Sequence, residues 1–126
     1  MTDMGTWKTK KVIDHSRGEK RYLTKEEYIE EGILDFETES IFMMLIEIKE
    51  EGVITQYILI PEERMAQAVE SGAEIDEMGR VYVEDFVWRE RDGQLFCIFE
   101  GREIPLEITE DGLLVFAEGV ALLERV

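Results

Sequence analysis

The sequence predicts an α+β domain: an antiparallel β-sheet of five to seven strands, in two hairpin or meander units, with one or two short helices packed on it. Three features lead to this prediction. An apolar hairpin lies near the centre of the chain, over residues 41–60. From residue 80 onward the hydrophobic pattern has a period of two, interrupted by Asp-Gly turns, which is typical of a meander. Two short segments, 24–32 and 61–72, carry helix start and stop signals.

Residues 1–23 are basic and show no clear hydrophobic period. Residues 1–25 hold seven Lys and Arg against three acidic residues. The stretch 6–13 is consistent with an edge strand, because its lysines discourage pairing between sheet edges, and equally with a mobile arm. Residues 15–19 predict a turn. We therefore expect a basic N-terminal arm or edge strand at 1–23 and a single acidic α+β domain at 24–126.

Both predicted helices begin at a recognisable residue. The Thr24 hydroxyl can accept a hydrogen bond from the Glu27 amide while the Glu27 side chain reaches back, which is a capping box. Gly32 is a typical end for this helix. Pro61 suits the first turn of the second helix, since it has no amide proton to leave unpaired, and Gly72 is a typical stop.

The central hairpin is predicted to have a strand at 41–48, a turn closed by Gly52 and a return strand at 53–60. Both faces of its first strand are apolar. One face carries Phe42, Met44, Ile46 and Ile48, and the other carries Ile41, Met43 and Leu45. We expect a central strand covered on both faces, or a strand with one face in the core and the other in a subunit interface.

The second half of the chain predicts a meander. Asp92-Gly93 is its strongest hairpin signal, because both residue types tolerate positive φ. Pro105 indicates an edge strand or a break. The tail, 118–126, is compatible with a short helix or a last strand. Strands are expected at 80–89, 95–99, 103–108 and 113–116.

The net charge of the chain is −16, and the acidity is concentrated after residue 25. Residues 26–126 hold seven basic and 27 acidic side chains. Such a body repels nucleic-acid phosphates and anionic lipids, so we expect no direct binding to nucleic acid or membrane and favour a basic protein partner. A thermophilic, salt-loving or compositionally biased host would also account for the acidity.

No set of side chains matches a catalytic, cofactor or metal site. His15 is the only histidine and lies in the basic segment, where we expect it in solvent. Cys97 is the only cysteine, which excludes a disulfide within the chain, and its aromatic neighbours indicate a small core residue. The chain contains no glycine-rich phosphate loop. We therefore predict no cofactor and no catalytic residues.

Carboxylates are so abundant that close pairs arise by chance. Glu84 and Asp85 stand out because neighbours on a strand face opposite ways, so one of them is expected on the covered face. A buried carboxylate needs a partner, such as Arg89 or Arg102. A solvated charge or a core ion pair is the expected role, and catalysis the alternative.

An acidic loop and an aromatic strand supply the candidate binding surface. The loop 73–79 lacks the spacing of a calcium-binding EF-hand, so we expect a solvated loop. Tyr82, Phe86 and Trp88 are expected to share one face, which is core if helices cover it and a contact surface otherwise. The candidate partner-binding residues are Tyr82, Glu84, Phe86, Trp88, Glu74, Asp76 and Glu77.

These features lead first to a non-enzymatic acidic protein-binding module, of the inhibitor, immunity-protein or chaperone type, that docks a basic partner. The alternative is a homo-oligomeric structural or accessory domain, such as a homodimer, in which the basic arm of one subunit meets the acidic body of the next. A metal-assisted carboxylate enzyme is the third hypothesis. The longest apolar run, 41–46, is too short to span a membrane and no signal peptide is visible, so we expect a cytoplasmic protein.

Overall fold

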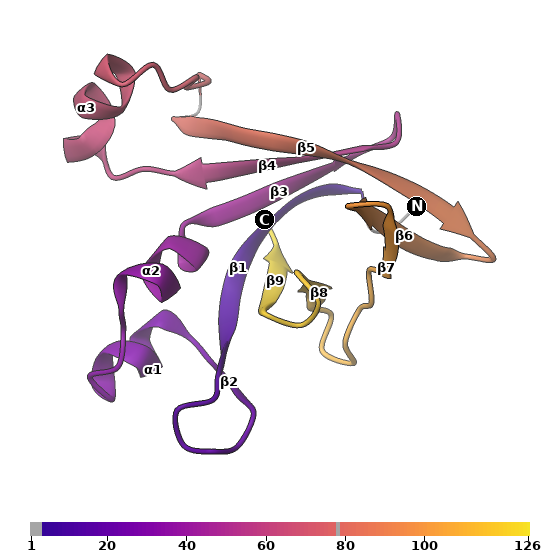
Figure 1. Cartoon of the computed structure of the whole chain (residues 1–126), viewed down its shortest axis with the longest axis horizontal. Coiled ribbons are helices and arrows are strands. Elements are labelled where there is room, and N and C mark those ends of the chain that lie inside the picture. Colours follow the sequence, from indigo (N-terminus) through magenta and orange to yellow (C-terminus); the bar gives the residue numbers. More distant parts are fainter. Residues whose placement is uncertain (1–3, 78) are drawn as a thin grey trace.

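The computed structural model describes residues 4–77 and 79–126, which form one curled antiparallel sheet with short helices beside it (Figure 1). Residues 1–3 of the predicted arm and Met78 of the predicted loop lie outside the described residues. Over the described ranges the sheet has nine strands, accompanied by three short α-helices. None of these helices is long and apolar enough to cross a membrane. The prediction of an antiparallel sheet with short helices is confirmed.

The strands are β1 (Gly5–Asp14), β2 (Arg21–Leu23), β3 (Met44–Lys49), β4 (Val53–Leu59), β5 (Arg80–Arg91), β6 (Gln94–Phe99), β7 (Arg102–Pro105), β8 (Leu114–Phe116) and β9 (Ala121–Arg125). The helices are α1 (Lys25–Glu30), α2 (Phe36–Phe42) and α3 (Met65–Glu70), and the 3₁₀ turn η1 (Glu62–Arg64) precedes α3. The strand order is β7-β6-β5-β4-β3-β1-β9-β8, with β2 paired to β1. The expected number of five to seven strands is too low, because the three-residue strand β2 is too short to show a period and the sequence allows alternatives to a strand at both ends of the chain.

Residues 106–109 join the two ends of this strand order. The Leu106 amide donates to the Leu95 carbonyl at 2.9 Å, on the β6 side. The Val115 amide of β8 donates to the Glu107 carbonyl at 2.8 Å. Backbone hydrogen bonds therefore pass from β6 through this segment to β8, and the sheet closes on itself. We call its inner side the concave face and its outer side the convex face.

The closed sheet encloses the main core, and β3 lies at its centre. β3 sits between β1 and β4 and contributes Met44, Ile46 and Ile48 to the concave face. Leu45, on its convex face, is only 4% exposed. Glu47 and Lys49 on the same face are half-buried, so the expected cover on both faces is confirmed only at Leu45. The largest fully buried side chains from other strands are Ile54, Leu95, Leu114 and Leu123.

The first strand of the central hairpin begins at Met44, so the sequence placed its start three residues too early. Helix α2 occupies the preceding residues. Asp35 caps it, accepting a hydrogen bond from the Thr38 amide at 2.7 Å. Phe42, at the end of α2, meets the ring of Tyr28 from α1 at 5.7 Å. The sequence did not reveal this boundary because the apolar run passes from helix into strand without a polar residue.

The segment expected as an N-terminal arm or edge strand, 1–23, instead supplies β1 inside the strand order. β1 pairs with β9 on one side and with β3 and then β2 on the other, since Val12 stands between Leu23 of β2 and Ala121 of β9. Trp7 and Thr9 are buried whereas Lys8 is exposed, so the lysine lies on a solvated face rather than at a sheet edge. A register shift between Thr9 and Lys11 interrupts the alternation, which explains why no continuous period is visible.

Several local predictions are confirmed. Thr24 and Glu27 form both hydrogen bonds of the capping box, at 2.8 and 3.3 Å. Asp92 and Gly93 both have positive φ, +53° and +80°, in the turn between β5 and β6. The tail forms the strand β9 rather than a helix, closing the sheet beside β1.

We expect Ile46→Ala to lower the free energy of unfolding by about 2–5 kcal/mol, because the lost methylenes leave a cavity at a position with no exposed surface. Ile29→Ala is the matched control, since Ile29 on α1 is 57% exposed. Its effect should stay within about 0.5 kcal/mol. Urea denaturation followed by tryptophan fluorescence measures both values, and equal losses would contradict the core position of Ile46.

Candidate functional site

A bulge in β5 determines which face each candidate residue occupies. Gln56 of β4 pairs with Glu84, whereas its neighbour Tyr57 pairs with Tyr82. Val83 is therefore an extra residue in β5. Because one inserted residue reverses the alternation of side chains, Glu84 lies on the concave face and Tyr82 on the convex face.

The predicted aromatic face is divided by this bulge. Phe86 and Trp88 pack against the core cluster on the concave side. The Trp88 indole N–H donates to the Lys49 carbonyl at 2.7 Å, which holds that ring at the end of the β3–β4 hairpin. Tyr82 points the other way. The prediction that the three aromatic residues share a face is therefore wrong for Tyr82, because a simple alternation does not anticipate an inserted residue.

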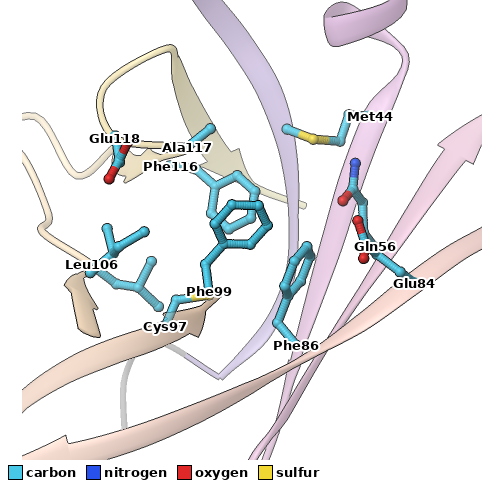
Figure 2. Close-up of a pocket in the computed structure, with 11 residues that line it drawn as sticks. Met44, Gln56, Glu84, Phe86, Cys97, Phe99, Leu106, Phe116, Ala117 and Glu118 are labelled. Atoms are coloured by element: carbon cyan, nitrogen blue, oxygen red, sulfur yellow. The ribbon is translucent and has the colours of Figure 1, made fainter. Parts of the chain in front are cut away.

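A pocket of about 330 Å³ opens on the concave face (Figure 2). Its apolar lining includes Met44, Phe86, Cys97, Phe99, Leu106 and Phe116. These side chains come from β3, β5, β6, β8 and the segment that closes the sheet. The volume falls at the lower end of the range usual for small-ligand pockets.

Aromatic rings form much of the wall of this pocket. The rings of Phe86 and Phe99 lie 5.9 Å apart at 53°, a tilted arrangement. Phe99, the last residue of β6, is 37% exposed and lies at the mouth. Figure 2 shows the rings of Phe86, Phe99 and Phe116 gathered around the same space. The pocket therefore offers a partly exposed apolar surface that an incoming group can cover.

Carboxylates flank the apolar wall at two places. Glu84 stands opposite Gln56 across the β4–β5 ladder, and both line the pocket. Within the described ranges, the side chains of these two residues form no hydrogen bond with another residue. On the other side of the pocket, Glu118 binds Arg102 at 3.1 Å, so its charge is already compensated. Glu84 is thus the carboxylate available to a cation that enters from solvent.

Asp85, the chain neighbour of Glu84, faces the convex side. Its carboxylate accepts a hydrogen bond from the Thr55 hydroxyl at 2.7 Å. The two carboxylates thus lie on opposite faces of β5, as expected for neighbours on a strand. Arg102, one of the partners considered for a buried carboxylate at this position, pairs with Glu118 instead.

A second, smaller pocket of about 230 Å³ lies on the convex face, and Tyr57, Glu74, Asp76, Arg80 and Tyr82 line it. The Arg80 guanidinium donates from Nε to Asp76 Oδ2 at 2.6 Å and lies 4.1 Å from the centre of the Tyr57 ring. Arg80 is therefore held by the protein itself. Three of the seven predicted binding residues, Glu74, Asp76 and Tyr82, belong to this pocket.

The acidic loop does not gather its carboxylates around one point. Asp76 binds Arg80, and Glu77 is exposed and lines neither pocket. Among the residues that the structure describes, no group of three or more His, Cys, Asp or Glu side chains could hold a metal ion.

His15 and Cys97, the two residues considered for nucleophilic chemistry, lie in different environments. His15 is exposed in the turn between β1 and β2. Cys97 is 6% exposed, belongs to the core cluster and contributes to the lining of the concave pocket. Burial raises the pKa of its thiol to about 11, which keeps it protonated at neutral pH.

No family model matches this chain, and neither a curated protein nor a solved structure is similar to it. Function is therefore inferred from the pockets themselves. Sequence analysis identified Glu84 and Phe86, which lie together on β5, but missed Phe99, Phe116 and Glu118. Those residues come from segments that reach the pocket only when the sheet closes, so no local pattern marks them.

We expect Cys97 to react slowly with iodoacetamide in the folded protein. The pKa rise from the ordinary 9.0 to about 11 lowers its thiolate fraction near pH 8 roughly a hundredfold. Mass spectrometry of quenched samples compares the native protein with protein unfolded in guanidinium. Native and unfolded rates within about threefold of each other would show that the base of the pocket is open to solvent.

Proposed function

We propose that this chain is a non-enzymatic binding protein that docks a basic protein partner. In this proposal the concave pocket receives an apolar side chain of the partner, while Glu84 meets a neighbouring cation. One observation carries the proposal: a carboxylate without a hydrogen-bonding partner among the described residues stands beside a half-open aromatic pocket. An inhibitor, immunity protein or chaperone for a basic protein would use such a surface.

The charge distribution supports a basic partner. The chain holds 30 acidic and 14 basic side chains, and several of the basic ones form ion pairs within the protein. Arg21 binds Asp14 and Glu31, Arg91 binds Glu103, and Arg102 binds Glu118. Internal pairing of the cations leaves a large excess of carboxylates facing solvent. Such an excess speeds association with a basic protein at low salt.

The aromatic pocket and the carboxylates are expected to contribute differently to binding, because their typical free energies differ. Burying a Phe- or Leu-sized side chain contributes about 1.5–3 kcal/mol, whereas an exposed ion pair contributes about 0–1 kcal/mol. The aromatic pocket should therefore supply most of the affinity. The carboxylates should govern the association rate and its dependence on salt.

The alternative of a homo-oligomer was based on two features, the second apolar face of the central strand and the basic N-terminal segment. Both find contacts within the single chain. Leu45, the apolar residue on the second face of β3, is only 4% exposed. The basic segment is paired within its own sheet as β1. These two features therefore no longer require a homodimer, which supports the proposal of a hetero-complex. We propose that this complex forms in the cytoplasm, and fractionation of source cells checks that location.

The test is a capture experiment with four variants. The wild-type protein and each variant are used to capture proteins from a source lysate at about 50 mM and about 500 mM salt. Phe99→Ser removes the ring at the pocket mouth, and Glu84→Gln removes the rim charge. The controls are Phe36→Ser, at a ring that is 81% exposed on α2, and Glu51→Gln in the exposed β3–β4 turn.

We expect a basic protein to bind the wild type and both controls at low salt and to be lost at high salt. Phe99→Ser should reduce its recovery about tenfold or more, in line with the burial term. Glu84→Gln should reduce it less and weaken its salt dependence. Equal recovery by all five proteins would place the docking surface away from the concave pocket.

A further inference from the structure

Strand β5 lacks a neighbour along part of one edge. β6 pairs with its C-terminal part, beginning where Val87 stands opposite Ile98. At its N-terminal part, the Tyr82 amide donates to the Glu74 carbonyl at 3.0 Å. Between these contacts, residues 83–86 have no strand on that side within the described ranges. Consistent with this gap, Val83, Glu84 and Asp85 are all exposed.

The backbone groups at this gap can be assigned from the neighbouring ladder. The Trp88 amide donates to the Gly52 carbonyl at 3.0 Å, on the β4 side. In an antiparallel strand, every second residue directs its backbone N–H and C=O toward the same neighbouring strand. The backbone groups of Phe86 therefore also point toward β4. Asp85 therefore directs its N–H and C=O toward the open edge. These two groups are a ready template for one more strand.

The gap lies between the two pockets. Glu84 and Phe86 line the concave pocket, and so does Phe99, after which β6 ends. Tyr82 and Glu74 line the convex pocket at the other end of the gap. A strand placed beside Asp85 would direct alternate side chains into the concave pocket and toward the convex face. Main-chain hydrogen bonds combined with side-chain pockets on alternate positions are the features of recognition by strand addition.

The side chains around the gap carry an excess of negative charge, which favours a basic strand over an acidic one. Glu74, Glu84 and Asp85 are the carboxylates beside it. Arg80, a cation near the same edge, is already bound to Asp76 at 2.6 Å. An added strand therefore meets an excess of negative charge, most of all on the convex side beside Asp85.

We propose that an extended, basic segment of the partner protein adds to the sheet as a short strand beside residues 83–86 of β5. Basic side chains lie beside Asp85 on the convex face, and apolar side chains alternate with them and enter the concave pocket. This inference rests on the proposed function and adds how the partner is held. A second copy of the chain is a poor occupant, because its own carboxylate-rich surface would be repelled.

The probe is the acetylated and amidated pentapeptide Lys-Phe-Lys-Phe-Lys, which alternates in the required way. One derivative is N-methylated at its three lysines and another at its two phenylalanines. Every second amide of an added strand points toward β5, so only one derivative loses its bonding amides. Both derivatives keep the same charges and side chains. Calorimetry at about 50 mM salt measures affinity, and amide exchange by NMR reports on Asp85.

We expect one N-methylated derivative to bind about tenfold more weakly than the parent peptide, and the other derivative to bind nearly as well as the parent. Loss of affinity in the derivative methylated at its lysines indicates that the added strand is antiparallel to β5. Loss of affinity in the derivative methylated at its phenylalanines indicates that it is parallel. The Asp85 amide should become protected on binding. Asp85→Asn, which keeps an acceptor for Thr55, should weaken binding through charge alone, whereas the control Glu51→Gln should not.

Three outcomes overturn the proposal in distinguishable ways. If both N-methylated derivatives bind equally well and their binding weakens with salt, strand addition is excluded but the proposal of a basic partner stands. If no basic peptide binds at low salt, the proposed function fails as well. If sedimentation shows that the chain dimerises by itself and thereby protects the Asp85 amide, the open edge belongs to a second copy.

Discussion

The interior of this protein depends on the backbone hydrogen bonds by which residues 106–109 join β6 to β8. Leu106 bonds to one side and Glu107 to the other, so groups that would remain unpaired at two sheet edges are satisfied. Closure directs alternate side chains of many strands into a common volume, where they form the main core. The concave pocket is the part of that volume that the side chains leave unfilled. The candidate site and the stability of the fold therefore rest on the same closure.

The second constraint is the single inserted residue in β5. Val83 reverses the alternation, so Glu84 stands beside the aromatic pocket while Tyr82 turns to the convex face. β6 is lost as a neighbour of β5 before Val87 for a separate reason, because β6 ends at Phe99 and the chain turns at Glu100 and Gly101. The bulge thus separates Tyr82 from Glu84 and Phe86, and the end of β6 leaves a stretch of sheet edge open beside them. The carboxylate excess of the chain then determines the sign of any partner attracted there.

Sequence analysis predicted the local parts of the fold and two residues of the concave pocket, Glu84 and Phe86. The capping box at Thr24, the Asp92-Gly93 turn and the apolar alternation of β3 depend on residues a few positions apart, so their patterns are visible in the chain. Helix α2 was missed because no polar residue separates it from β3. Glu84 and Phe86 were identified as neighbours on one strand. Phe99, Phe116 and Glu118 were not, because they reach the pocket from separate strands and turns.

The sequence by itself determined that this protein has an antiparallel sheet with short helices, a central apolar strand and an acidic surface. Hydrophobic period, turn chemistry and charge are local properties, and they act before any distant segments meet. Only the tertiary structure decided that the basic N-terminal segment lies within the sheet, that the sheet closes, and that the predicted binding residues divide between two faces. Those outcomes depend on register and bulges, which are set by the fit between segments far apart in the chain: the Tyr22 hydroxyl, for example, donates to the Gly119 carbonyl across 97 positions.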